Sequence, residues 1–243
     1  MKKFGIGLLM ISLAFTACKK DDEFNDLPQD EQNETDDRAI SDYLEDHYFD
    51  SEKGLIKKFD ADDESDDNYQ SLMAQATKLP SGVWIVKREG VTAEGPSITD
   101  NLTDSILISY TSSRFKATYN DLEEGEKAYA KYSTSFFNTI YSTGTPAWDP
   151  IFYYKDISQT LQNNGIKEEQ FVIEGFVEGL KHFKATLTSG EELYNFQGAI
   201  IVPSRMAYGR EFVYINGSLD PSTYRDNSFI FNFELHKIVP RNN

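Results

Sequence analysis

The chain has 243 residues, a formal net charge of −16 at pH 7, and 40 acidic against 24 basic residues. This balance excludes nucleic acid as a partner, because binding to backbone phosphates requires clustered Lys and Arg. With 17 Phe and 14 Tyr, the chain beyond its acidic first 40 residues is long and apolar enough for one well-buried domain.

Residues 1–18 have the pattern of an export signal. Lys2 and Lys3 precede an apolar run, and small residues precede Cys18. The run is shorter than the roughly 20 residues that a membrane-spanning helix needs. Cys18 is the only cysteine, and its position resembles the lipobox of bacterial lipoproteins. This resemblance implies a lipidated Cys18 and a protein anchored in the bacterial outer membrane or cell envelope, periplasmic or surface-exposed; an ordinary secretory signal is the alternative.

Two segments separate this signal from the first strands. Residues 19–36 are polar and acidic, which predicts a flexible tether. Residues 37–79 are expected to form a helical extension followed by an acidic loop. Ile40, Tyr43 and Leu44 fall at helical spacing, so the pattern predicts a helix over 37–48, either packed on the domain or acting as a docking arm.

The acidic loop at residues 60–67 is interpreted as a solvated surface loop. A calcium-binding EF-hand loop needs Gly at its sixth position and Glu at its twelfth, where this chain has Ser65 and Ser71. The three histidines share no metal-ligand spacing, and no nucleotide-binding or nucleophile motif is present. We therefore expect neither a metal nor a cofactor.

Strands are predicted at residues 83–86 and 105–110, which are rich in β-branched and aromatic residues and separated by glycine-containing turns. Further along, Phe229, Phe231 and Phe233 alternate, so they share one face of a strand as core or pocket residues.

Three short motifs are the most informative part of the chain. Residues 172–180 read V-I-E-G-F-V-E-G-L, residues 202–209 read V-P-S-R-M-A-Y-G, and residues 229–235 read F-I-F-N-F-E-L. In this order they resemble the FKBP-type peptidyl-prolyl cis-trans isomerases, whose pattern is V-I-x-G-W-x-x-G-L, I-P-x-x-L-A-Y-G and L-x-F-x-V-E-L. The resemblance covers residues 80–240 and implies an α+β fold, in which a curved antiparallel sheet wraps around one short helix near 176–184.

The chain departs from the family in length. Between Tyr110 and Val172 it is about twice as long as the family, with extra residues around 112–120 and 150–170. Surface loops absorb such insertions at small entropic cost, so the fold is expected to survive them, whereas the rim of the pocket is open to change.

The resemblance also assigns site residues. As catalytic residues it implies Tyr110, Ile173, Phe176 and Tyr208, and as substrate-binding residues Val172, Phe231, Phe137 and Asn138. Phe176 stands where the family has tryptophan at the pocket floor. Tyr208 is expected to present its hydroxyl to the substrate carbonyl, and the backbone N–H of Ile173 to hold the substrate.

The aspartate that lines the family's pocket is absent under either alignment of this region. One alignment puts Ala128 and Tyr129 at the family's Phe-Asp pair, and the other puts Phe137 and Asn138 there.

These features predict an envelope-anchored prolyl isomerase that acts on proline-containing polypeptide segments. An X-Pro bond rotates slowly because rotation breaks amide resonance, and a catalyst needs only to favour the twisted amide. The alternative is a catalytically weak binding or chaperone lipoprotein of the same fold, which the missing aspartate and the long insertions favour. A third hypothesis is a surface lipoprotein that captures glycans through Trp84 and Trp148.

Overall fold

A computed structural model describes residues 24–118, 129–133, 135–188 and 194–241 of the chain. Its main element is a sheet of seven strands in the order β3-β4-β8-β11-β5-β6, with β7 paired to β5, and every pairing is antiparallel. The strands are β3 (Ala76–Lys78), β4 (Trp84–Lys87), β5 (Asp104–Thr118), β6 (Tyr129–Ser133), β7 (Ala147–Trp148), β8 (Gly198–Val202) and β11 (Asn227–Pro240).

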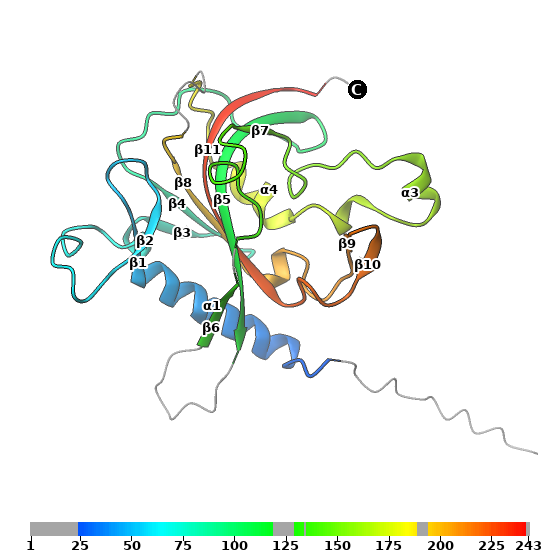
Figure 1. Ribbon diagram of the computed structural model, residues 1–243, viewed down its shortest axis with the longest axis horizontal. Coiled ribbons are helices and arrows are strands. Elements are labelled where there is room, and N and C mark those ends of the chain that lie inside the picture. Colours follow the sequence, from blue (N-terminus) through cyan, green and yellow to red (C-terminus); the bar gives the residue numbers. More distant parts are fainter. Residues whose placement is uncertain (1–23, 119–128, 134, 189–193, 242–243) are drawn as a thin grey trace, which may run out of the picture.

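Two long strands, β5 and β11, form the centre of this sheet and curve across the molecule (Figure 1). Their pairing runs from Asp104 opposite Pro240 to Lys116 opposite Asn227, with an irregularity between Leu235 and Lys237. The strands predicted at 83–86 and 105–110 are confirmed as parts of β4 and β5. Strand β5 continues to Thr118, so residues 112–118, expected as inserted material, extend the sheet.

One long helix, several short ones and two small hairpins complete the described part of the fold. The helices are α1 (Gln29–Asp46), α2 (Leu72–Gln75), α3 (Gln159–Asn163), α4 (Glu174–Leu180) and the 3₁₀ turns η1 (Glu168–Gln170) and η2 (Ser204–Met206). The hairpins pair β1 (His47–Phe49) with β2 (Ile56–Lys58), and β9 (Val213–Ile215) with β10 (Ser218–Asp220). No helix within the described residues is long and apolar enough to cross a membrane.

The front face of the main sheet, defined here as the face that packs on α4, carries the larger core. Strand alternation sends Phe229, Phe231 and Phe233 to this face, as the sequence predicted, and Phe176 of α4 contacts Phe231 with ring centroids 4.6 Å apart. All four rings are fully buried, so α4 lies inside the curve of the sheet.

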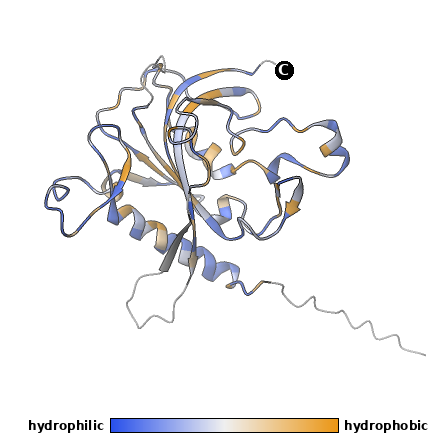
Figure 2. Ribbon diagram, in the orientation of Figure 1, coloured by the Kyte–Doolittle hydropathy of each residue, from blue (hydrophilic) through white to orange (hydrophobic). Residues whose placement is uncertain are grey.

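The back face, defined as the face that packs on α1, carries a second core. Ile230 of β11 and Phe115 of β5 point to this side and meet Ile40 and Leu44 of α1. Figure 2 shows the apolar residues of α1 concentrated in its C-terminal half, while its N-terminal half is hydrophilic. The predicted helix therefore exists and packs on the domain.

The start of α1 corrects the sequence interpretation. The helix begins at Gln29 and not near residue 37, so residues 29–36 of the predicted flexible tether are helical. Gln32, Thr35 and Asp36 are completely buried in it. Periodicity missed this half because its buried residues are polar and are stabilised by partners distant in sequence, such as the Ala117 carbonyl that accepts from Gln32.

This architecture confirms the predicted fold class: an α+β, FKBP-like fold with a curved antiparallel sheet around one short helix and a helical extension at the N-terminal side.

Candidate functional site

Most residues of the predicted pocket lie in the core of the front face. Tyr110 of β5, Phe176 of α4, Phe231 of β11 and Tyr208 after η2 all belong to the front core, together with Ile173 at the start of α4. Tyr110 and Tyr208 are 6% and 5% exposed, and the other three side chains are fully buried. We call the space between Tyr110, Ile173, Phe176 and Phe231 the slot. Tyr208 lies beside it and packs on Tyr224 and Phe229.

Two glycines let α4 approach the sheet closely enough to form the floor of the slot. A Cβ atom at Gly175 would lie 2.5 Å from Val202 Cγ1, and one at Gly179 would lie 2.7 Å from Ile200 Cγ2. Both distances are shorter than any real contact of a Cβ atom, so the V-I-E-G-F-V-E-G-L motif needs glycine at both positions.

The slot is filled by Phe152, a residue for which the sequence predicted no role. Its ring is fully buried and lies 4.9 Å from Phe176, 4.8 Å from Phe231 and 5.1 Å from Tyr110, measured between centroids. Phe152 belongs to the insertion between Tyr110 and Val172. The aromatic run Ile151 to Tyr154 was a sequence signal that this part of the insertion is buried.

The polar groups expected to hold a substrate also have partners within the chain. The backbone N–H of Ile173 donates to the carbonyl oxygen of Phe152 at 2.9 Å. The hydroxyl of Tyr208 donates to the carbonyl oxygen of Phe171 at 2.7 Å. Burial raises the pKa of the Tyr208 hydroxyl, and it raises that of Tyr110 to about 12, so both phenols are neutral at physiological pH.

An open hollow of about 220 Å³ lies beside the slot, and we call it the aromatic cup. It extends outward from Tyr208 and is lined by rings from three separate stretches of chain. Its aromatic residues are Phe136, Phe137, Phe171, Tyr208, Tyr214 and Tyr224, joined by Ile151, Gln170, Val213, Ile215 and Asn216. None of the described residues that line the cup is charged. Among these rings Phe137 is 43% exposed, so the cup has a solvent-accessible aromatic rim.

The rings of the cup and the slot form one continuous stack. Tyr224 lies against Tyr208 with centroids 5.5 Å apart, and Phe136 contacts both Tyr224 at 5.1 Å and Phe152 at 6.0 Å. Phe136 and Tyr224 were absent from the predicted site. The motifs that carry the family resemblance include neither of them, and only the fold brings them to Tyr208.

Two neighbouring residues of the predicted site, Phe137 and Asn138, lie in different places. Phe137 lies at the cup, whereas the adjacent Asn138 does not reach the slot. Asn138 accepts from the backbone N–H of Tyr141 at 2.8 Å and lines a hollow bordered by Tyr43 and Asn232. Neighbours in an extended segment point in opposite directions, which separates Asn138 from Phe137.

Val172 lies on the outer side of the slot and lines two shallow hollows of about 360 and 370 Å³ next to Glu169 and Glu174. The alternative alignment put Ala128 and Tyr129 at the position of the family's Phe-Asp pair. Ala128 lies outside the described residues, and only the backbone of Tyr129, in β6, is described. The predicted lipidation site Cys18 also lies outside the described residues.

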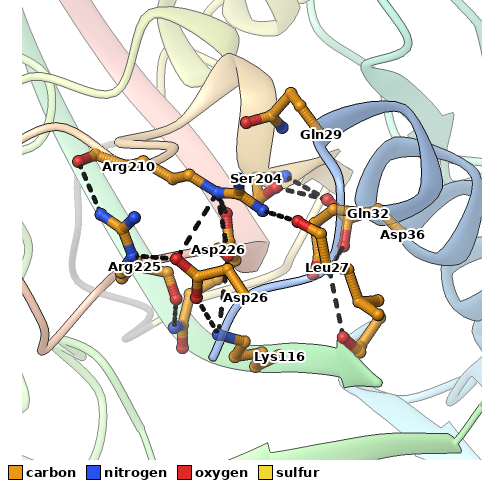
Figure 3. A network of polar contacts seen from close by, with 12 residues as sticks. Asp26, Leu27, Gln29, Gln32, Asp36, Lys116, Ser204, Arg210, Arg225 and Asp226 are labelled. Carbon is orange, nitrogen blue, oxygen red and sulfur yellow. Dashed lines mark hydrogen bonds and ion pairs between the residues drawn. The ribbon is translucent and has the colours of Figure 1, made fainter. Parts of the chain in front are cut away.

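The loop that carries Tyr208 is held from the back face by the N-terminal segment (Figure 3). Asp36 of α1 accepts from the Ser204 hydroxyl and, at 3.1 Å, from its backbone N–H. Arg210 donates to the carbonyl oxygen of Leu27 at 2.6 Å and pairs with the buried Asp226 at 2.9 Å. We call these contacts the polar clamp; they fix both ends of the loop from Ser204 to Arg210.

Within the described residues no group of three or more His, Cys, Asp or Glu side chains is placed to hold a metal ion. His236 contacts Ser109 at 2.9 Å and lies 3.6 Å from Glu234, an order that resembles a catalytic triad. All three side chains are buried on the central strands β5 and β11, and Thr188 also contacts His236 at 2.7 Å, so we interpret the cluster as structural.

Comparisons with known proteins find no matching family model and no matching curated protein. Similar solved structures include the following two. FkpA from Escherichia coli shares 19% identity over 68% of this chain and 52% of its own, with a TM-score of 0.34, so the chain spans about half the length of FkpA. A peptidyl-prolyl cis-trans isomerase from Pseudomonas syringae shares 13% identity over 88% of this chain and 98% of its own, with a TM-score of 0.38.

The fold class itself rests on the topology and packing of this chain. Together, the curved sheet, the glycine-packed α4 and the convergence of rings at Tyr208 define an FKBP-like α+β domain with a filled slot and an open aromatic cup.

Proposed function

We propose that this protein binds unfolded, proline- and aromatic-containing polypeptide segments at the aromatic cup, as a chaperone-type protein of FKBP-like fold on a bacterial envelope membrane. The observation that carries the proposal is the pairing of a filled slot with an open cup. Phe152 leaves no room for a proline ring in the slot, whereas the cup presents accessible rings next to it.

The chemistry of the cup suits such a ligand. Aromatic side chains offer large contact areas with little loss of conformational freedom, and they pack well on proline and aromatic rings. The tyrosine hydroxyls at the rim can exchange hydrogen bonds with a peptide backbone. Because the described residues that line the cup are uncharged, the cup favours apolar segments, and the net charge of −16 favours clients that are neutral or basic.

Binding to a permanently unfolded protein tests this proposal. Reduced, carboxamidomethylated ribonuclease A, an unfolded basic chain, serves as the probe, with affinity measured by fluorescence anisotropy. A double variant with Phe137→Ala and Tyr214→Ala is expected to lose about tenfold or more in affinity, since aromatic anchors dominate binding energies. Leu187→Ala is the matched control, because Leu187 is 59% exposed and lies outside the cup. Equal affinity of the double variant and the wild type would remove the proposal.

A second candidate function is prolyl isomerisation. It is supported by the presence of Tyr110, Ile173, Phe176, Tyr208 and Phe231 in one buried core, the set implied by the family resemblance. Catalysis would require the slot to favour a twisted X-Pro amide over both planar forms. A direct assay of cis-to-trans conversion in a short X-Pro peptide tests it. A wild-type rate no faster than that of the Tyr208→Phe, Phe176→Ala double variant excludes the activity.

Membrane attachment is part of the proposal and is supported by the sequence around Cys18. Metabolic labelling with a palmitate analogue in a bacterial host is expected to mark the wild-type protein and not the Cys18→Ala variant, and the wild type is expected to fractionate with membranes. An unlabelled wild-type protein would contradict lipid anchoring without affecting the cup.

A further inference from the structure

We infer that Phe152 acts as an internal ligand of the slot and determines its specificity: its ring takes the place of a substrate ring, and its carbonyl takes the place of a substrate carbonyl. Removing the ring should therefore convert a closed slot into one that accepts a proline ring. The inference deepens the proposed function and rests on its closed slot, with a proline ring taken as a compact apolar occupant.

The first argument is the position of the ring. Phe152 comes from the insertion, yet it touches walls contributed by β5, α4 and β11, with three ring centroids within 5.1 Å. Two of these contacts are edge-on, at interplanar angles of 87° and 89°. Such edge-to-face packing is the favourable geometry of an aromatic side chain in an aromatic cavity.

The second argument is the backbone. The N–H of Ile173 donates to the carbonyl oxygen of Phe152, so ring and carbonyl of a single residue satisfy both the apolar and the polar requirements of the slot. Because Ile173 precedes α4, this N–H is one of the groups at a helix start that need a partner from outside the helix.

The third argument is that the segment has its own anchors on both sides of Phe152. Before it, the carboxylate of Asp149 accepts from Arg241 at 2.6 Å and from the backbone N–H of Ile106 at 2.9 Å. After it, the hydroxyl of Tyr153 donates to the carbonyl oxygen of Asp104 at 2.9 Å, and the Arg241 guanidinium lies 3.4 Å from the centroid of the Tyr154 ring.

These anchors do not use the Phe152 side chain. Truncation at residue 152 therefore removes the ring while the backbone of residues 149–154 stays in place. They also hold the ring in the slot, so a polypeptide does not displace it from the wild-type protein.

The Phe152→Ala variant tests this inference with a fluorescein-labelled Ala-Leu-Pro-Phe peptide as the probe. The variant is expected to bind the peptide at least about tenfold more tightly than the wild type, because a buried proline ring gains several methylene contacts. The matched control is Phe183→Ala. Phe183 is 3% exposed and belongs to the same core, but it packs on Phe233 at 4.9 Å, away from the cup, so its loss should leave peptide affinity at the wild-type level.

A folded Phe152→Ala variant with wild-type peptide affinity would overturn the inference, as would an equal gain in Phe183→Ala. If Phe152→Ala does not fold, Phe152→Leu provides a smaller truncation with a smaller expected gain. A measurement on the wild type does not depend on either variant: in an amide NMR titration with the peptide, the Ile173 N–H should not shift. A shift of that amide, together with faster hydrogen exchange at residues 152–154, would show displacement of the ring and contradict the inference.

The result of this peptide-binding test can be distinguished from the result of the client-binding test of the cup. Binding of carboxamidomethylated ribonuclease A to the same variants reports on Phe137 and Tyr214, and Phe152→Ala is expected to retain it. A gain in peptide binding without any client binding would support the role of Phe152 and reject the cup, and the reverse result would do the opposite.

Discussion

The two faces of the main sheet are packed by different means. On the front face, rings from α4, β5, β11 and the inserted segment pack against one another. On the back face, only the C-terminal half of α1 packs on apolar residues, while its N-terminal half and the residues before it bind the sheet and the Tyr208 loop through carboxylates and arginines. The packing of the front face therefore depends on the shape of its side chains. The packing of the back face depends on charged groups and therefore on pH.

The two faces are also connected through one loop. Tyr208 contributes its ring to the front, while Ser204, Arg205 and Arg210 on the same loop bind Asp36, Asp37 and Leu27 at the back. The N-terminal helix is thus a part of the domain that positions the site.

The first prediction tests the ring packing of the front face and has the largest effect on stability. Phe231→Ala removes a ring that packs against Phe152 at 4.8 Å and Phe176 at 4.6 Å, and should lower the free energy of unfolding by about 3–5 kcal/mol. Phe212→Ala is the control, because Phe212 is 49% exposed and its loss should cost less than about 0.5 kcal/mol. Urea denaturation measures both; similar losses in the two variants would contradict the packing described for the front face.

The second prediction tests the polar contacts of the back face through the pH dependence of stability. Burial raises the pKa of Asp36 to about 6 from its ordinary value of 3.8, against opposing hydrogen bonds from Ser204 and Gln32. A raised pKa means that the folded state binds the proton more tightly, so the contribution of Asp36 to stability is fully present below about pH 4 and is lost as the pH rises through about 6.

Replacing Asp36 by Asn removes this titration. The stability of Asp36→Asn relative to the wild type should therefore increase by up to about 3 kcal/mol between pH 4 and pH 7.5, which corresponds to a shift of about two pKa units. Groups with lowered pKa, such as Asp26 and Asp104, act in the opposite direction but equally in both proteins, so they cancel in the difference. Urea titrations at the two pH values measure it, and a difference independent of pH would show that Asp36 does not titrate in this range.

A third effect separates charge from backbone geometry in the clamp. Asp226 is fully buried, pairs with Arg210 at 2.9 Å, and has a left-handed backbone with φ of 54°. Asp226→Asn loses the charge but tolerates this backbone, and should cost about 2 kcal/mol. Asp226→Ala should cost about 1 kcal/mol more, because Ala is strained at positive φ. Thermal unfolding compares the variants, and an equal cost for Asn and Ala would remove the backbone contribution.

The smallest effect concerns the residue shared by the two faces. Tyr208→Phe keeps the ring and removes the hydroxyl that donates to Phe171, so it should cost about 1 kcal/mol of stability. Client binding at the cup should change little, since the hydroxyl is already used within the chain. A large loss of client binding in this folded variant would indicate that the Tyr208 hydroxyl leaves Phe171 and contacts the ligand.

The front face of the main sheet was largely predictable from the sequence, whereas the polar contacts of the back face were not. Alternation in β11 and the glycine-spaced motif of α4 are local patterns, so the front face could be predicted from residues such as Phe231 and Phe176. Phe152 was missed because a family resemblance says nothing about inserted residues, although its aromatic neighbours signalled burial. The polar clamp was missed because Asp36 and Ser204 bind each other across 168 positions of the sequence, and the sequence does not distinguish a buried acidic residue from a solvated one.

The central pairing of β5 with β11 has a consequence for how the chain acquires its structure. Lys116 lies opposite Asn227 and Asp104 opposite Pro240, so every rung of this ladder joins positions more than a hundred residues apart. Chains dominated by such distant contacts lose much entropy before the contacts form, and they fold more slowly than helical proteins of similar stability. Nascent molecules of this protein therefore expose their apolar strands for longer than a helical bundle does, and during that interval they themselves need protection from aggregation.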